Sequence, residues 1–152
     1  MRRQIILMSF IAIGYSQIYT QEIRDFISPG IKLGYDFGND RGFTFGLECS
    51  FTRLKKIDSY GIVAAIDFHR ELYRFHIGVE GSRAFGLEWG PSLIVDGGPS
   101  LEFGHSLTVF FGVLVFPYYT ITFRTDSGNL YETGSYMKIP MQTSGGRIGI
   151  GK

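Results

Sequence analysis

Histidine is the side chain of this sequence best able to hold a metal or move a proton at neutral pH, and the chain has three. A histidine metal site needs two or three further ligands that converge on one ion. His76 shares an alternating segment with Arg74 and Glu80, and Cys49 is the single cysteine, so no cysteine cluster can form. We interpret His76 as a member of a polar network and expect no metal site.

A serine stands beside a histidine in the segment Phe103-Gly-His-Ser-Leu107, which could suggest a nucleophile with its base. Residues on the same face of a strand are two positions apart, so His105 and Ser106 point to opposite faces. Position 107 is a leucine, which has no hydroxyl. No phosphate-binding loop, CxxC pair or HExxH helix occurs elsewhere. We expect no enzymatic activity and no cofactor.

Composition narrows the class of protein. The 152 residues carry a formal net charge of +1, which is not the strong positive balance of a nucleic-acid-binding protein. Charged residues make up 19%, whereas Phe, Tyr and Trp together make up 16%, so the chain is not disordered. Its 21 glycines are about twice the usual share of about 7%.

The first segment is typical of a secretory signal peptide. Arg2 and Arg3 precede a short apolar core from Ile5 to Ile13, and Gly14 and Ser16 have the small-residue spacing of a cleavage site. This core is shorter than the ~20 residues that a membrane-spanning helix needs. We predict removal of residues 1–16 and a single domain over residues 17–152.

Apolar and polar residues alternate with a period of two along the rest of the chain, which indicates β-strands. The pattern predicts ten candidate segments, of which we favour eight full strands while ten stay possible. We expect turns, rims or bulges at Gly90-Pro-Ser92, Gly98-Pro-Ser100 and Phe116-Pro117, because proline cannot donate to a strand ladder. The segments predicted are 31–38, 42–51, 60–69, 73–80, 85–90, 100–104, 106–113, 119–124, 131–141 and 147–151.

The composition of the two faces predicts which face is inside. The polar face holds glycine, serine, threonine and scattered charges, which suits a narrow barrel interior, whereas the apolar face is almost free of charge, as a bilayer requires. Tyrosine and phenylalanine near the strand ends would form interfacial girdles. The candidate lumen network is Lys32, Asp36, Glu48, Asp67, Arg74, His76, Glu80, Glu88 and Glu102. The candidate lipid-facing residues are Phe43, Phe45, Leu47, Phe51, Phe75, Ile77, Leu107, Val109, Phe111, Ile121 and Phe123.

Four segments resemble the small outer-membrane β-barrel families of Gram-negative bacteria, the OmpX/OmpA-transmembrane and PorT-like group. They are Gly30–Phe37, Gly98–Gly104, Ser135–Met141 and Gly145–Gly151. Barrels of this group usually end in an aromatic residue, whereas this sequence ends in Gly151-Lys152.

The fold expected is therefore an all-β, antiparallel, up-and-down transmembrane barrel with its apolar face outward. The resemblance implies a monomer in the outer membrane, with outer-membrane lipids and the barrel-assembly machinery as partners and no nucleic acid. We expect a structural or interfacial role. Two alternatives stay open: a narrow, porin-like channel or transport component, and a secreted, soluble, lipocalin-like barrel that binds an apolar ligand.

Overall fold

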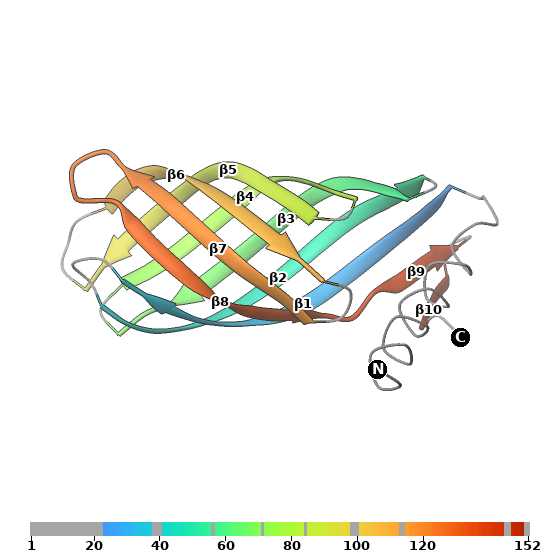
Figure 1. Cartoon of the computed structure of the whole chain (residues 1–152), viewed down its shortest axis with the longest axis horizontal. Helices are drawn as coiled ribbons and strands as arrows, with labels where there is room; N and C mark the ends of the chain where they lie inside the picture. The colour runs from blue at the N-terminus through green and yellow to red at the C-terminus, as the bar shows by residue number, and fades with distance from the viewer. Residues whose placement is uncertain are drawn as a thin grey trace, which may run out of the picture.

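A computed structural model shows the chain as a β-barrel (Figure 1). It describes residues 23–37, 41–55, 57–70, 72–83, 85–97, 101–112, 115–144 and 147–150. The predicted signal peptide, residues 1–16, lies outside this range. In the part of the chain that the structure describes, no helix has the length and apolar character needed to cross a membrane.

Ten strands follow one another along the chain, and each of β1 to β7 pairs with the next strand in antiparallel fashion. Alternating apolar and small polar residues favour this conformation because successive side chains point to opposite faces. The strands are β1 (Arg24–Asp36), β2 (Gly42–Lys55), β3 (Asp58–Phe68), β4 (Leu72–Ser82), β5 (Phe85–Asp96), β6 (Leu101–Phe111), β7 (Val115–Arg124), β8 (Leu130–Lys138), β9 (Met141–Ser144) and β10 (Arg147–Ile150).

The barrel closes where β8 pairs with β1, from Gly30 opposite Lys138 to Asp36 opposite Glu132. Closure leaves no free edge among these eight strands. The prediction of an eight-stranded, up-and-down barrel is confirmed.

One row of paired residues gives the stagger of the barrel. The row starts at Ile27 and runs through Phe51, Ile62, Val79, Trp89, Leu107, Ile121 and Tyr131. The Tyr131 carbonyl then accepts the N–H of Phe37 at 2.8 Å, so the row returns to β1 ten residues beyond its start. A stagger of this kind requires the strands to tilt, typically by roughly 35–45° from the barrel axis. The strands are visibly slanted in Figure 1.

β9 and β10 extend the wall at one end of the barrel (Figure 1). β9 pairs with β1 from Asp25 to Ile27, in the register that β8 uses further along β1, and β10 pairs with β9. Pro140 interrupts the ladder between β8 and β9, although the N–H of Ile139 still donates to the carbonyl of Pro29 at 2.9 Å. β9 is thus a continuation of β8, and β10 is one additional strand.

The barrel has two ends, the β9 end and the far end, which carry different connections between strands. The β9 end has the connections at residues 56–57, 83–84 and 112–114, and the far end has those at residues 37–41, 69–71, 97–100 and 125–129. All of them are short.

Three sequence predictions about the strands are corrected. The first strand begins at Arg24 and not at Ile31, and the segments 100–104 and 106–113 form the single strand β6. Gly90–Ser92 lies inside β5 and is not a turn. Pairing with β4 is interrupted beside Pro91, which has no N–H to donate, while Pro91 still faces His105 of β6. Residues 98–100 lie outside the described range.

Candidate functional site: the charged interior and apolar outer face of the barrel

The two faces of the wall differ in chemistry. All nine residues of the predicted lumen network are buried, and none is more than 8% exposed. Of the eleven residues predicted to face lipid, nine are exposed, while Leu107 and Ile121 are half-buried. The polar side chains therefore fill the barrel, and the apolar ones cover its outside.

The outer face carries charge only at one margin. Within the described parts of β1–β8, the charged residues that point outward are Asp25, Arg53, Lys55 and Asp58. All four lie at the β9 end, where Asp25 pairs with Arg53 and Lys55 with Asp58. The guanidinium of Arg53 donates two hydrogen bonds to Asp25, at 2.7 and 3.0 Å, and these lower the pKa of that exposed carboxyl.

Between this margin and the far end, the wall is an apolar belt. On β2, for example, the outward positions from Phe43 to Phe51 alternate with inward Thr44, Glu48 and Ser50. This stretch matches the roughly 9–11 residues with which a tilted strand crosses a bilayer.

Aromatic rings gather toward both margins of the belt. At the far end, Tyr35 contacts Phe43 with ring centroids 5.3 Å apart, and Phe68 contacts Tyr73 at 5.9 Å. At the β9 end, Phe85 stands opposite Phe111 across β5 and β6. Two aromatic rows therefore flank a middle zone rich in leucine, isoleucine and valine.

One strand displays the layers of the interior. The inward residues of β4 run from the far end in the order Leu72, Arg74, His76, Gly78, Glu80 and Ser82. Their exposed fraction rises from 2% at Leu72 and 1% at Arg74 to 6% at His76 and 8% at Glu80. Ser82 is half-buried. The lumen is thus sealed toward the far end and more open toward the β9 end.

An apolar plug closes the far end. Leu72, Ile94 and Leu130 pack together, and each is at most 2% exposed. They are inward residues of β4, β5 and β8, close to the far-end connections. Because this layer is dry and tightly packed, it blocks a continuous aqueous path through the lumen.

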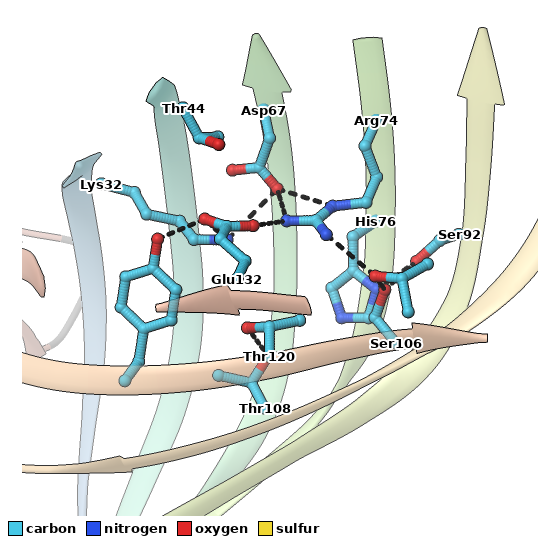
Figure 2. Close-up of polar contacts among 12 residues, drawn as sticks. Lys32, Thr44, Asp67, Arg74, His76, Ser92, Ser106, Thr108, Thr120 and Glu132 are labelled. Atoms are coloured by element: carbon cyan, nitrogen blue, oxygen red, sulfur yellow. Dashed lines mark hydrogen bonds and ion pairs between the residues drawn. The ribbon is translucent and has the colours of Figure 1, made fainter. Parts of the chain in front are cut away.

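A central cluster of four charged residues follows the plug in the direction of the β9 end. Figure 2 shows its members, Lys32, Asp67, Arg74 and Glu132. Arg74 donates to Asp67 Oδ2 from Nε at 3.0 Å and from Nη2 at 2.6 Å, and Nη2 also contacts Glu132. Lys32 Nζ lies 3.2 Å from Asp67 Oδ2 and 3.3 Å from Glu132 Oε1. Two cations thus neutralise two carboxylates, which is the condition for burying charge at tolerable cost.

A ladder of hydroxyls continues this cluster across the strands (Figure 2). Arg74 Nη1 donates to Thr122 Oγ1 at 2.8 Å, and Thr122 joins Ser106 at 2.8 Å. Ser106 joins Ser92 at 2.6 Å, and Ser92 joins His76 Nδ1 at 3.0 Å. The small inward residues noted in the sequence therefore connect the charged residues by hydrogen bonds.

A second group, the carboxylate cluster, lies nearer the β9 end and comprises Glu48, Glu80 and Glu88. Lys138 Nζ lies 2.5 Å from Glu48 Oε1 and 2.8 Å from Glu80 Oε2. His76 Nε2 lies 2.8 Å from Glu88 Oε1. Three acids here face one lysine and one histidine.

Inward aromatic rings fill the space beside these charges. Phe110, Tyr118 and Tyr136 form a buried group, with Phe116 packed against it. Tyr118 donates to Glu132, and its hydroxyl would lie 2.2 Å from a Cβ placed on Gly34. The absence of a side chain on that glycine is what admits the phenol.

At the far rim, Glu102 fixes the connection between β7 and β8. Its carboxylate accepts hydrogen bonds from the N–H groups of Asp126 and Ser127 at 2.8 and 2.9 Å. Arg124 donates to the same carboxylate at 2.8 Å. Also near this end, His69 Nε2 lies 3.1 Å from Asp36 Oδ2. The two outermost members of the predicted network thus stabilise the rim rather than the centre.

The sequence prediction missed several interior residues. Glu132 contacts Lys32 of the central cluster, and Lys138 contacts Glu80 of the carboxylate cluster. Tyr118 and Tyr136 belong to the same buried aromatic group. Glu132 and Lys138 share the inward phase of β8 with Leu130 and Tyr136. The segment 131–141 was predicted as a strand without assigning its faces, so these inward residues were not identified.

Two groups of acids and histidines have metal-ligand spacing: Asp36 with His69 and Glu132, and the carboxylate cluster. In the first, Glu132 is already bound by Arg74, Lys32 and Tyr118, so it has little capacity for an ion. An internal cavity of about 10 Å³ lies between the two clusters. It is room for about one water molecule and far below the ~300 Å³ of a small-molecule pocket.

The chain matches no protein-family model. No curated protein and no solved structure is significantly similar to it.

Proposed function

We propose that this protein is an exported outer-membrane β-barrel of a Gram-negative bacterium, with a structural or interfacial role and no enzymatic activity. It is a monomer whose belt contacts outer-membrane lipids, and the barrel-assembly machinery inserts it. The observation that carries the proposal is the absence of charge from the outer wall of the described strands, between the β9-end margin and the far end, beside a charged interior.

A soluble barrel has the opposite arrangement, because water favours polar side chains outside and apolar ones within. Here Phe43 is 83% exposed and Phe85 is 70% exposed, whereas Asp36 and Glu132 are 0% exposed. Contiguous apolar surface on this scale marks a contact with a membrane or another protein. Aromatic rows at both margins of the belt support the membrane.

The interior supports a structural role over the two alternatives. Paired charges, aromatic rings and the apolar plug fill the described lumen, so a diffusion path through it would require breaking the Arg74 contacts. An apolar ligand would have to displace that network as well. The resemblance to small outer-membrane barrels in the strand pattern points the same way.

Two arginine substitutions on β2 test the lipid contact by depth. Leu47 points outward from the middle of the belt, and Phe43 points outward at its far-end margin. We expect Leu47→Arg to lower the free energy of unfolding in lipid bilayers by about 2–4 kcal/mol, and Phe43→Arg by only about 0–1 kcal/mol. Reversible urea unfolding in lipid vesicles measures both.

Equal and small effects of these two substitutions would contradict the proposal, because an arginine on a wall that faces water has a similar cost at either position. Glu48→Leu reports separately on the inward neighbour of Leu47. Glu48→Leu leaves the outer wall unchanged and removes one partner of Lys138. Any change that it causes in the free energy of unfolding therefore comes from the interior of the barrel.

A further inference from the structure

The carboxylate cluster gathers more acidic side chains than basic partners. One carboxylate oxygen each from Glu48, Glu80 and Glu88 lies within 4.8 Å of the others, and all three residues are buried. Glu80 and Glu88 are direct cross-strand partners in β4 and β5. Like charges in that position destabilise a sheet, so the arrangement requires a positive partner.

The chain supplies only part of that partner. The ammonium of Lys138 contacts a single oxygen of Glu48 and a single oxygen of Glu80, and His76 contacts Glu88. Three carboxylates thus share one lysine and one histidine, so acidic side chains outnumber basic ones in the cluster. The central cluster of Lys32, Asp67, Arg74 and Glu132 has no such excess.

The hydroxyl of Tyr136 is the second observation that points to a ligand. Tyr136 is 1% exposed, and within the described part of the chain its hydroxyl makes no hydrogen bond. It interacts electrostatically with all three glutamates, and together with Glu48 and Glu88 it lines the cavity of about 10 Å³. A buried tyrosine hydroxyl normally has a polar partner.

We propose that the carboxylate cluster binds one divalent cation of the hard, oxygen-seeking class, with Ca²⁺ as the best match, and that the Tyr136 hydroxyl is a further ligand. Carboxylate and neutral oxygen atoms are the ligands of Ca²⁺, which tolerates irregular sets at about 2.3–2.6 Å. The three carboxylate oxygens lie within 4.8 Å of one another, so small side-chain movements bring all of them to that distance from one ion. A divalent cation also adds positive charge where acidic side chains outnumber basic ones.

The exposure gradient along β4 gives the route of entry. Glu80 is 8% exposed and Arg74 is 1% exposed, and beyond Glu80 the inward Ser82 is half-buried. The ion therefore enters from the β9 end, and the plug at the far end prevents its passage across the barrel. The site holds an ion and does not conduct it.

Calcium titration of the full chain, folded in detergent and freed of metal with a chelator, tests the site. Isothermal titration calorimetry and the midpoint of thermal unfolding are the two readouts, with MgCl₂ and matched NaCl as comparison salts. We expect one Ca²⁺ per chain and a midpoint that rises with calcium, because a ligand that binds only the folded state stabilises it.

Two variants and one control locate the binding. Glu88→Gln removes a charged ligand, and we expect at least tenfold weaker Ca²⁺ binding from it. Tyr136→Phe removes only a hydroxyl without a hydrogen bond, so it should fold as the parent does and bind Ca²⁺ several-fold more weakly. Glu102→Gln, at the far rim, should bind Ca²⁺ as the parent does.

Absence of heat and of any shift in the midpoint at millimolar calcium would overturn the proposal. Equal shifts in the parent, Glu88→Gln and Tyr136→Phe would do so too, because they would place the ion on the outer surface. The proposal rests on the barrel interior alone. A chain that binds Ca²⁺ but folds in plain buffer would keep the cation site and contradict only the membrane proposal.

Discussion

Single residues inside this barrel act as members of a charge network and not as isolated polar groups. Arg74, for example, contacts Asp67, Glu132 and Thr122 and is 1% exposed. Removing one partner of a buried pair leaves the other charge without compensation, which costs far more than the pair contributes when intact. Stability should therefore depend strongly on the identity of this residue.

We expect Arg74→Met to lower the free energy of unfolding by about 3–5 kcal/mol, since Asp67 and Glu132 then lose one of the two cations that they share. The matched control is Arg53→Met, which removes an arginine from an exposed pair with Asp25 and should change stability little. Urea unfolding in detergent, followed by circular dichroism, measures both. Similar effects of the two substitutions would contradict the buried network.

The period of the sequence was enough to find most of the interior. Strict alternation on β2 and β4 separated inward Glu48, Arg74 and Glu80 from their apolar neighbours. The same method failed on β8, because the outward positions 133 and 135 of that strand are Thr133 and Ser135 and both faces are therefore polar. Contacts between strands far apart in the sequence, such as Lys138 with Glu48, follow from closure and cannot be derived from periodicity.

At the scale of the strands, glycines set how closely neighbouring backbones approach. Gly34 and Gly134 face each other where β1 and β8 close the barrel. A Cβ on Gly134 would lie 2.1 Å from the carbonyl oxygen of Leu33, which is part of the backbone and has little freedom to move. Gly90 similarly allows β5 to pass close to β4 beside Pro91. The sequence prediction of a turn, rim or bulge at Gly90-Pro-Ser92 did not foresee this close contact within the sheet.

We expect Gly134→Ala to destabilise the closing seam by about 1–3 kcal/mol, the usual cost of inserting a methyl group where there is no space. Gly81→Ala is the matched control, because its Cβ would meet only the Ser59 carbonyl oxygen at 3.8 Å. The difference between their unfolding midpoints in detergent measures the effect. A Gly134→Ala barrel as stable as Gly81→Ala would show that the seam is looser than described.

At the scale of the whole molecule, a filled lumen and an apolar wall support the proposal that this barrel has a bilayer as its solvent. The single tryptophan, Trp89, reports on that solvent because it points outward and is 56% exposed. Its ring stacks on His105 at a centroid distance of 6.1 Å, and Trp89 pairs with Val79 and Leu107 within the belt.

Lipids with brominated acyl chains should quench the fluorescence of Trp89 strongly in vesicles. Brominated and ordinary lipids are compared at the same protein concentration. Full emission of Trp89 in brominated vesicles would place this part of the wall outside the hydrocarbon.

The most direct test of the membrane proposal is folding itself, measured for residues 17–152 by circular dichroism and by gel migration with and without boiling. Outward apolar side chains need an apolar solvent, so the account predicts a β-rich species that forms only with detergent or lipid and changes its migration on boiling. A β-rich monomer that folds in plain buffer would contradict it, because the apolar belt would then be stable in water.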